Sequence, residues 1–193
     1  MTPSSLRDPV TYIRVVDEAE ATGRLREVYE AVRAARGSVG NIMKAESLQP
    51  EALQKHLDLY AELLYGKGGL SRREREMVAV VVSAANKCAY SIVHHADALG
   101  RYVTEPGLVP LLVADASKAP LDQRERAIVN AAVRLTKHAE EWTKGDVDTL
   151  HLAGMQDDDV LGLVQLVAYF NFANRLAIGT GATPEDADKR YLY

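Results

Sequence analysis

The sequence predicts an all-α fold, and two observations carry that prediction. Apolar residues recur at three- and four-residue spacing along several segments, which is the period of an amphipathic helix. No segment shows the apolar–polar alternation of a half-buried strand, and no low-complexity tract or long linker interrupts the sequence. The 193 residues are 47% hydrophobic and 26% charged, as is usual for a globular chain. We therefore expect a helical bundle, with residues 1–193 forming a single domain.

The first two predicted helices cover residues 18–35 and 51–65. The first ends at the Gly-Ser-Val-Gly sequence that follows Arg36, and the second stops at Gly66-Lys-Gly-Gly. Apolar side chains share one face in each of these helices. They are Leu25, Val28, Tyr29 and Val32 in the first helix, and Leu53, Leu57, Tyr60, Leu63 and Leu64 in the second.

A capping box predicts the start of the next helix. In Ser71-Arg-Arg-Glu74, the serine hydroxyl and the glutamate carboxylate would each bind an exposed backbone amide of the other residue. The valines that follow favour a strand when taken alone, but the cap, the alanines and the length favour a helix. We expect a break at Asn86 or Lys87 and a new helix over residues 88–99.

The start of this helix is repeated fifty-one residues later, where Leu121-Asp-Gln-Arg-Glu-Arg-Ala-Ile-Val follows the pattern of Leu70-Ser-Arg-Arg-Glu-Arg-Glu-Met-Val. The repeat indicates two helices of one type and hence two related helical halves. Glu76 of the first copy corresponds to Ala127 of the second, so only the first copy carries this extra carboxylate. The remaining expected helices are a short apolar segment at 108–114, two further starts at Thr143 and Met155, and a long apolar helix between Asp159 and Ile178.

Composition excludes several classes of partner. The net charge of −4, with both signs interspersed, gives no basic stripe for a nucleic acid. The amino terminus lacks the apolar core of a signal peptide, and no apolar run approaches the ~20 residues that span a bilayer. A single cysteine, Cys88, cannot form an internal disulfide, which suits a reducing compartment. We therefore expect a cytoplasmic protein that binds no nucleic acid and no membrane, and nothing in the sequence indicates a cofactor or a metal.

One stretch, from Glu76 to His95, combines residues that suit a reactive site. Cys88 at the first turn of a helix meets unpaired backbone amides, which favour thiolate over thiol. Ser91 and His95 follow three and seven residues later and project to nearly the same face, whereas His94 points about a quarter-turn away. Glu76 lies on the preceding helix, and whether it reaches His95 depends on the turn between them. If the two meet, the carboxylate holds one imidazole nitrogen and raises the basicity of the other.

Ordinary structural roles compete with this interpretation. A lone cysteine is more often an inert buried side chain, and a single histidine is usually a surface or core residue, which is how we interpret His56, His138 and His151. Glu76 also fits a first-turn acid that the helix dipole favours. A second polar cluster lies on one face of the long apolar helix, where it is expected to bond a neighbouring helix, a subunit or the site itself. Its members are Asn171, Asn174 and Arg175.

Together, Glu76, Cys88, Ser91 and His95 resemble the Glu-x11-Cys-x-x-Cys-x-x-x-His signature of alkylhydroperoxidase D-like proteins, in the carboxymuconolactone decarboxylase superfamily. Three of the four positions match, and Ser91 replaces the second cysteine. The resemblance covers about residues 41–183. Its surroundings look like the peroxidase-related branch, at Leu70-Ser-Arg-Arg-Glu-Arg-Glu, His94-His95 and Tyr169-Phe-Asn-Phe-Ala-Asn-Arg-Leu.

The resemblance implies an alkylhydroperoxidase D-like helical bundle that forms a homo-oligomer, commonly trimer- or hexamer-based, and an antioxidant peroxidase acting on small hydroperoxides. In that family the second cysteine attacks peroxide, activated by the histidine and glutamate, and the first closes a disulfide with it. Ser91 cannot become a sulfenic acid, and Cys88 has no second thiol in the chain.

Three alternatives follow from this substitution. In the first, Cys88 attacks peroxide itself and an external thiol regenerates it. In the second, Glu76 and His95 perform sulfur-independent acid–base chemistry on a small carboxylated lactone or related ring, as in the lactone decarboxylases of the superfamily. In the third, the chain is a non-catalytic oligomeric or binding module.

Overall fold

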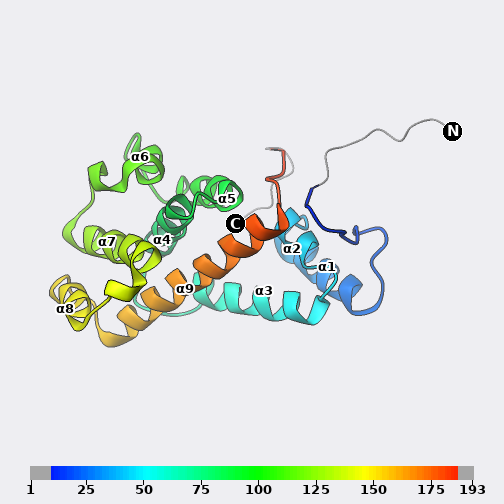
Figure 1. The fold of residues 1–193 in the computed structure, drawn as a ribbon, viewed down its shortest axis with the longest axis horizontal. Coiled ribbons are helices and arrows are strands. Elements are labelled where there is room, and N and C mark those ends of the chain that lie inside the picture. Colours follow the sequence, from blue (N-terminus) through cyan, green and yellow to red (C-terminus); the bar gives the residue numbers. More distant parts are fainter. Residues whose placement is uncertain (1–9, 187–193) are drawn as a thin grey trace. The chain divides into compact units, whose positions relative to one another are not determined.

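The computed structural model describes residues 10–186, and within this range the regular elements are helices, with no strand (Figure 1). The all-α prediction is therefore confirmed. In chain order the elements are α1 Gly23–Arg36, α2 Asn41–Ala45, α3 Pro50–Tyr65, α4 Arg72–Ala85, α5 Ala89–Leu99, α6 Leu108–Asp115, the 3-10 turn η1 Ala116–Lys118, α7 Gln123–Lys137, the 3-10 turn η2 Ala139–Glu141, α8 Lys144–Leu152 and α9 Asp157–Thr180.

The chain divides into two compact units. One contains the residues up to Gln54 together with those from Leu176 onward, and the other is Lys55–Arg175. Each predicted site residue lies in the second unit, so the fold of that unit decides the geometry of the site. The single domain expected over residues 1–193 stays a prediction.

At the amino-terminal side one predicted boundary differs from the structure, and one helix was not predicted. α1 begins at Gly23 and not at residue 18, because the residues before it form a turn in which the Glu20 amide donates to the Asp17 carbonyl at 3.0 Å. α2 was not predicted, since five residues are too few to show a helical period. Most of the amino-terminal stretch on which the signal-peptide prediction rests lies outside the described residues.

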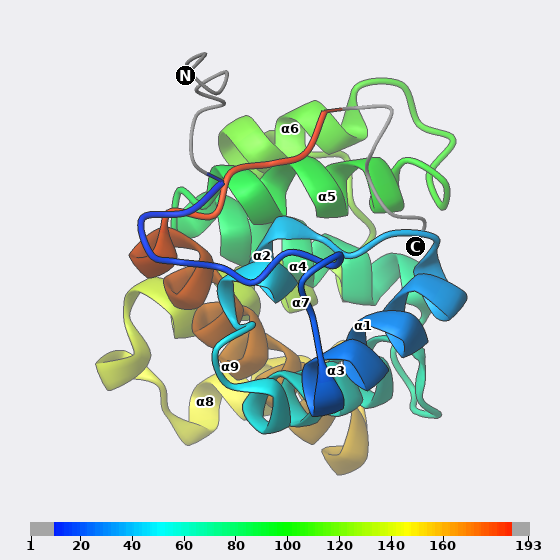
Figure 2. The same ribbon diagram turned by 90° about the vertical axis from the view of Figure 1, so that its right-hand side faces the viewer.

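Helices α4 and α5 form an antiparallel hairpin joined by a tight turn, and α4 also packs against α6 and α7 (Figure 2). The Ser71–Glu74 capping box predicted at the start of α4 is present. At the turn, Lys87 has a left-handed backbone, with a φ of 56°, and the Cys88 amide donates to the Ser83 carbonyl at 2.9 Å. Cys88 is therefore the residue that precedes the first turn of α5, close to where the sequence placed it.

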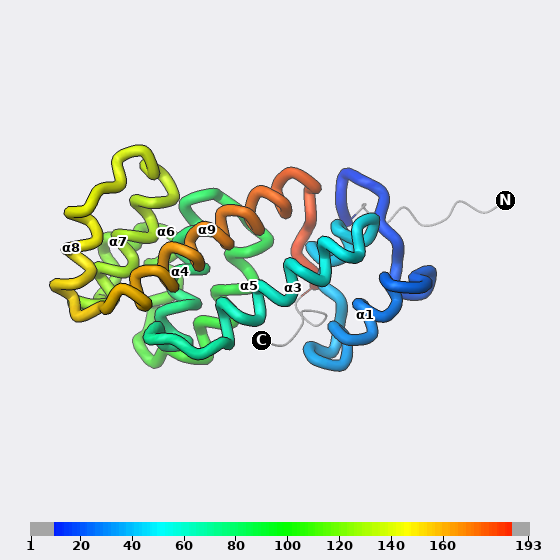
Figure 3. The backbone as a smooth tube through the Cα atoms, turned by 90° about the horizontal axis from the view of Figure 1, so that it is seen from below, coloured from blue at the N-terminus to red at the C-terminus, as the bar shows by residue number. Residues whose placement is uncertain are grey.

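The predicted repeat has a structural counterpart at the starts of α4 and α7 (Figure 3). Arg73 Nε donates to Glu125 Oε1 at 2.7 Å, and Arg124 Nε donates to Glu74 Oε1 at the same distance. Arg73 corresponds to Arg124 in the repeat, and Glu74 corresponds to Glu125. Such an exchange of equivalent contacts is what a local two-fold axis produces, as in a symmetric dimer interface. The two helix starts thus pair as related copies.

A further pair of arginines extends this correspondence. Arg75 donates through Nη1 to the carbonyls of Leu63 and Gly66, at 3.0 and 2.9 Å. Its equivalent, Arg126, donates through Nη1 to the carbonyl of Ala116 at 2.6 Å. In each half, therefore, the same arginine ties the helix start to the segment before it.

Helix α9 is long and apolar enough to cross a membrane by length and composition, with a mean hydropathy of 1.2 over its best window. This differs from the expectation that no apolar run would approach that length. A core helix of a globular protein passes the same test, and Leu163, Leu166 and Phe170 of α9 are buried. One such helix is weak evidence for a membrane span.

Candidate active site

The contact that the sequence left open, between Glu76 and His95, is present. Glu76 Oε2 lies 2.7 Å from His95 Nδ1, and both side chains are buried. The antiparallel hairpin explains this contact, because it sets the second turn of α4 beside the last turns of α5. The ring of Phe170, from α9, stands edge-on to the imidazole with 4.7 Å between ring centroids. Packing and hydrogen bonding together fix the orientation of His95.

Arg72 also belongs to the site, although the sequence analysis did not single it out. Its Nη2 donates to Glu76 Oε1, and its Nη1 donates to the Leu64 carbonyl at 3.1 Å. Arg72 and Glu76 are four residues apart on α4, a spacing that brings side chains together on one helix face. That spacing was the available signal in the sequence. Glu76 therefore has two basic partners, one from each helix of the hairpin.

The charge state of Glu76 follows from these partners. Burial by itself would raise the pKa of this carboxyl group, but the charge and hydrogen bond of His95, followed by those of Arg72, outweigh it and hold the pKa below its ordinary value of 4.5. An ionised carboxylate only accepts hydrogen bonds, so His95 Nδ1 carries a proton and donates it to Glu76. In the neutral imidazole the basic lone pair is therefore on Nε2.

Cys88 and Ser91 are in contact, as their spacing predicted. The Cys88 thiol donates to Ser91 Oγ with 3.5 Å between sulfur and oxygen, and both side chains are buried. Ser91 and His95 lie four residues apart on α5, so thiol, hydroxyl and imidazole follow one another along one helix face. Glu76, on α4, is linked to these three residues by its hydrogen bond with His95. His94 packs against Tyr90 instead, with 4.5 Å between ring centroids.

The polar cluster of α9 bonds neighbouring helices, which is the first of the three expected roles. Asn171 Nδ2 donates to Thr136 Oγ1 of α7 at 3.1 Å, and Asn171 Oδ1 accepts from Asn86 at 3.0 Å. Asn174 Oδ1 accepts from Ser83 of α4 at 3.2 Å. Arg175 donates to Asn171. These bonds hold α9 against the carboxyl-terminal end of α4.

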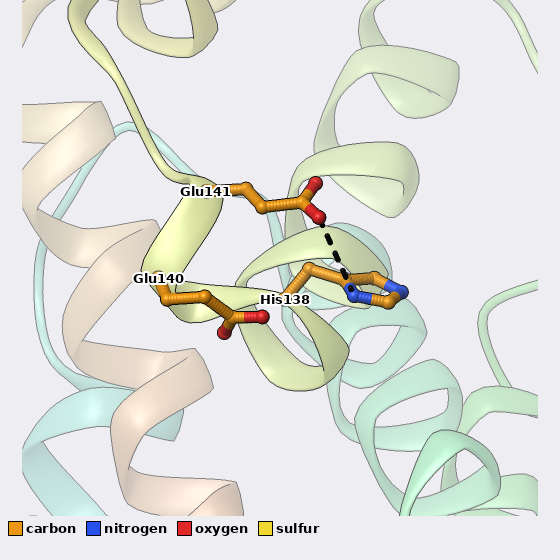
Figure 4. A group of neighbouring side chains, drawn as sticks. All are labelled: His138, Glu140 and Glu141. Carbon is orange, nitrogen blue, oxygen red and sulfur yellow. Dashed lines mark ion pairs between the residues drawn. The ribbon is translucent and has the colours of Figure 1, made fainter.

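Among the described residues, one group of side chains has the spacing of metal ligands. His138, Glu140 and Glu141 bring ligand atoms within 4.8 Å of one another (Figure 4). All three are exposed, and exposed acidic groups commonly gather in this way without a metal. The other two histidines that we expected to be structural are paired. His56 Nε2 lies 2.8 Å from the Tyr169 hydroxyl, and His151 Nε2 lies 3.0 Å from Asp157.

Comparison with known proteins places the chain in a family. The model of the carboxymuconolactone decarboxylase family matches residues 50–112, a stretch that contains Glu76, Cys88, Ser91 and His95. An uncharacterized peroxidase-related protein from Silicibacter sp. TM1040 has a similar structure, with 31% identity and a TM-score of 0.84 over 96% of each chain. A peroxidase-related protein with an alkylhydroperoxidase AhpD core, from Ralstonia eutropha JMP134, shares 28% identity with a TM-score of 0.85, over 93% of this chain and 95% of that one.

A more distant likeness is limited to the fold. The debrominase Bmp8 superposes with a TM-score of 0.75 at 17% identity, over 95% of each chain. No match was found among curated proteins. The helical fold, the Glu76–His95 contact on the α4–α5 hairpin and the near full-length match to the Silicibacter protein agree with one another. The chain belongs to the carboxymuconolactone decarboxylase superfamily and has the alkylhydroperoxidase D-like fold.

Proposed function

We propose that this protein is a one-cysteine hydroperoxidase, in which Cys88 reduces small hydroperoxides and an external thiol regenerates it. The observation that supports this proposal most directly is the 2.7 Å contact between the buried Glu76 carboxylate and His95, on the helix that also carries Cys88. A general base needs a fixed orientation and a basic nitrogen, and Glu76 provides both by holding Nδ1. The family and the peroxidase-related neighbours agree with an enzyme of this superfamily.

The first chemical step oxidises the sulfur. The thiol proton passes by way of the Ser91 hydroxyl, which accepts the thiol hydrogen bond, to Nε2 of His95, two helical turns along α5. The Cys88 thiolate then attacks the terminal oxygen of the hydroperoxide ROOH. The sulfur–oxygen bond forms as the oxygen–oxygen bond breaks, so Cys88 becomes a sulfenic acid and the peroxide is reduced. The departing alkoxide takes the proton from His95 and leaves as the alcohol ROH. Ser91 Oγ, 3.5 Å from the sulfur, is placed to donate a hydrogen bond to the thiolate.

The second step requires a thiol from outside the chain, because Ser91 has no sulfur to form a disulfide. An external thiol attacks the sulfenic acid, water leaves and a mixed disulfide remains on Cys88. A second external thiol then releases Cys88 as a free thiol and carries away a disulfide of the two reductant molecules. Such a cycle suits a reducing compartment, so we include a cytoplasmic location in the proposal.

Assembly into a homo-oligomer, trimer- or hexamer-based, is also part of the proposal. Leu59 of α3 and Phe172 of α9 flank an apolar groove with a volume of about 350 Å³, and each is about half exposed, as is Leu161. Exposed apolar patches of this kind commonly mark interaction surfaces. Light scattering coupled to size-exclusion chromatography measures the oligomer directly, and a monomer at micromolar concentration would remove this part of the proposal.

A sulfur-independent acid–base enzyme is the second candidate. It is favoured by the same Glu76–His95 pair, because a buried carboxylate that holds an imidazole would suit proton transfer on a small carboxylated lactone. The two candidates differ in what Cys88 contributes. Turnover of a lactone that survives Cys88→Ala and is lost in Glu76→Gln would favour this second candidate.

The test of the proposed hydroperoxidase activity measures the oxidation of Cys88, the single cysteine of the chain. Stoichiometric peroxide should give a sulfenic acid at Cys88 that reacts with dimedone and is detected by mass spectrometry. Peroxide should then be consumed catalytically when a low-molecular-weight thiol is added. His95→Gln should slow sulfenic acid formation. His151→Gln is a matched control, because it removes an exposed histidine that also pairs with a carboxylate, and it should leave the rate unchanged. The absence of any dimedone adduct in the folded wild-type protein would overturn the proposal.

A further inference from the structure

We propose that Arg72, with Tyr65 and Tyr102, forms an anion-recognising entrance to the Glu76–His95 pair. We call these three residues the Arg72 entrance, and the ligand it would take is a carboxylate on an apolar or aromatic body. The inference rests on the proposed function only in naming the substrate, which would be a hydroperoxide that carries a carboxylate. Recognition of the anion itself depends on Arg72 alone.

The exposure of the side chains increases from the Glu76–His95 pair toward Tyr65 and Tyr102. Glu76 is fully buried, and the Arg72 side chain above it is 15% exposed. Tyr65 and Tyr102, which border Arg72, are 51% and 42% exposed. Arg72 therefore lies between the buried carboxylate and two side chains at the surface. A molecule that approaches the pair from this side meets the guanidinium group first.

The two tyrosines frame the guanidinium group. Its central carbon lies 4.0 Å from the centroid of the Tyr65 ring and 5.8 Å from that of Tyr102. Both distances fall within the roughly 6 Å range of a cation–π interaction. The rings therefore hold the cation in place and present aromatic surface beside it. Such a setting suits a ligand that has a carboxylate at one end and an apolar body at the other.

Arg72 has a donor that is not used. Its Nη1 and Nη2 bind the Leu64 carbonyl and Glu76, but its Nε is enclosed and has no hydrogen-bond partner in the described structure. Buried polar groups of native proteins nearly always have a partner, so an orphan donor calls for an explanation. Nε and Nη2 form one edge of the guanidinium fork, which matches the two oxygens of a carboxylate. A bound carboxylate would accept hydrogen bonds from the two nitrogens of this edge. Glu76 would then lose its bond with Arg72 and keep its bond with His95.

The charges near Arg72 favour an anion. Arg75, one turn further along the same helix, donates to backbone carbonyls, and no ion pair of its guanidinium group is found within the described residues. Glu62 and Glu74 act on the charge of Arg75 through space, and Glu74 is already paired with Arg124. The amino-terminal end of α4 adds the positive end of a helix dipole. The positive charge beside Glu76 on α4 is therefore that of Arg72, which the helix end reinforces.

The first experiment compares two ligands of the same shape, benzoate and the neutral benzamide, by calorimetric titration of the full chain. Wild type should bind benzoate about tenfold more tightly or better, because a hydrogen bond to a charged group is worth at least that factor. The preference should disappear in Arg72→Gln and be partly restored in Arg72→Lys. Lys67→Gln is the matched control, because it removes an exposed cation from the segment just before α4, and it should keep the preference.

The second experiment uses Cys88 as the reporter and requires no peroxidase activity. The anionic reagent iodoacetate and the neutral iodoacetamide alkylate the same thiol, so the ratio of their rates reports on the entrance. The ratio should be about tenfold higher in wild type than in Arg72→Gln. If Arg72→Gln does not fold, the comparison is made with Arg72→Lys, for which an intermediate ratio is expected.

Equal binding of benzoate and benzamide to wild type would overturn the entrance, and so would an unchanged preference in Arg72→Gln. A clear anion preference without any sulfenic acid on Cys88 would support the entrance and remove the hydroperoxidase. The two proposals can therefore fail separately.

Discussion

The substitution Glu76→Gln tests the central argument about the site, because it keeps the shape of the side chain and removes its charge. The ionised carboxylate accepts from both Arg72 Nη2 and His95 Nδ1. A glutamine amide has one oxygen and one NH2 group, so it can accept from only one side while it donates to the other. Arg72 cannot accept a hydrogen bond, so it keeps the oxygen. His95 Nδ1 must then accept from the NH2 group, and the ring proton moves to Nε2.

The magnitude follows from the two bonds. A hydrogen bond to a charged group contributes about 1.5–3 kcal/mol, and a neutral one contributes about 0.5–1.5 kcal/mol. The Arg72 guanidinium stays charged, so only the bond to His95 becomes a bond between neutral groups, which should cost about 1–1.5 kcal/mol of unfolding free energy at neutral pH. The pKa of Glu76 is lowered in the folded state, so its contribution is present above the ordinary value of 4.5 and is lost as the pH falls through the folded pKa. The difference in unfolding free energy between wild type and Glu76→Gln, which we call the gap, should become smaller at acidic pH.

Urea unfolding at neutral pH and below pH 4.5 measures this gap, and nitrogen NMR of the histidine rings reports which nitrogen carries the proton. The control is Glu30→Gln, which breaks an Arg–Glu pair of the same four-residue spacing on the surface of α1. It should cost no more than about 0.5 kcal/mol. A gap that does not change with pH, or a His95 that keeps its proton on Nδ1 in Glu76→Gln, would refute the reasoning.

Three further substitutions test other parts of the structure. Ser91→Cys places a second sulfur where Oγ now lies 3.5 Å from the Cys88 sulfur, so peroxide should consume two thiols per chain in a thiol count, and a count of one would contradict it. Lys87→Gly should raise the thermal midpoint, because a non-glycine residue in the left-handed conformation costs roughly 1 kcal/mol, whereas Lys87→Ala should not raise it. A double-mutant cycle on Arg73→Ala and Glu125→Ala should give a coupling free energy of about 0.5–1 kcal/mol. Additive effects of the two substitutions would show that this ion pair does not stabilise the fold.

Much of the helical layout could be predicted from local sequence, because the capping residues determine where helices begin. Capping boxes form at Ser71 and Asp122, where the repeat predicted helix starts, and α8 begins after Thr143 as expected. Where no cap was available, prediction failed. The start of α1 was placed five residues too early, because Asp17 forms a turn with its own neighbours. Where a side chain such as that of Asp17 competes with a helix for backbone amides, the sequence shows no apolar period from which the turn could be predicted.

For the site, the sequence was informative within a helix and uninformative between helices. The spacing of Cys88, Ser91 and His95 predicted a common face of α5, and the thiol–hydroxyl contact agrees with it. The Glu76–His95 contact depends on the turn at Lys87, which has a left-handed backbone. Glycine is the usual residue in that conformation, so a lysine there gives no sign of the turn in the sequence. Arg72 was overlooked because an arginine in the first turn of a capped helix looks like a solvated residue. Its role appears only when Glu76 is seen to be buried.

The internal repeat bears on how α4, which is buried on several sides, directs its two neighbouring acids to different helices. Glu74 and Glu76 are two residues apart, so their side chains leave α4 on nearly opposite sides. Glu74 binds Arg124 of α7, and Glu76 binds His95 of α5. The reciprocal arginine–glutamate pairs fix the register of α4 against α7, and the turn at Lys87 sets that of α4 against α5, where Glu76 meets the imidazole. In the second copy the equivalent position is Ala127, so α7 supplies the same frame without the acid. The symmetric part of the repeat therefore joins α4 to α7, and the asymmetric residue, Glu76, is the one that contacts His95.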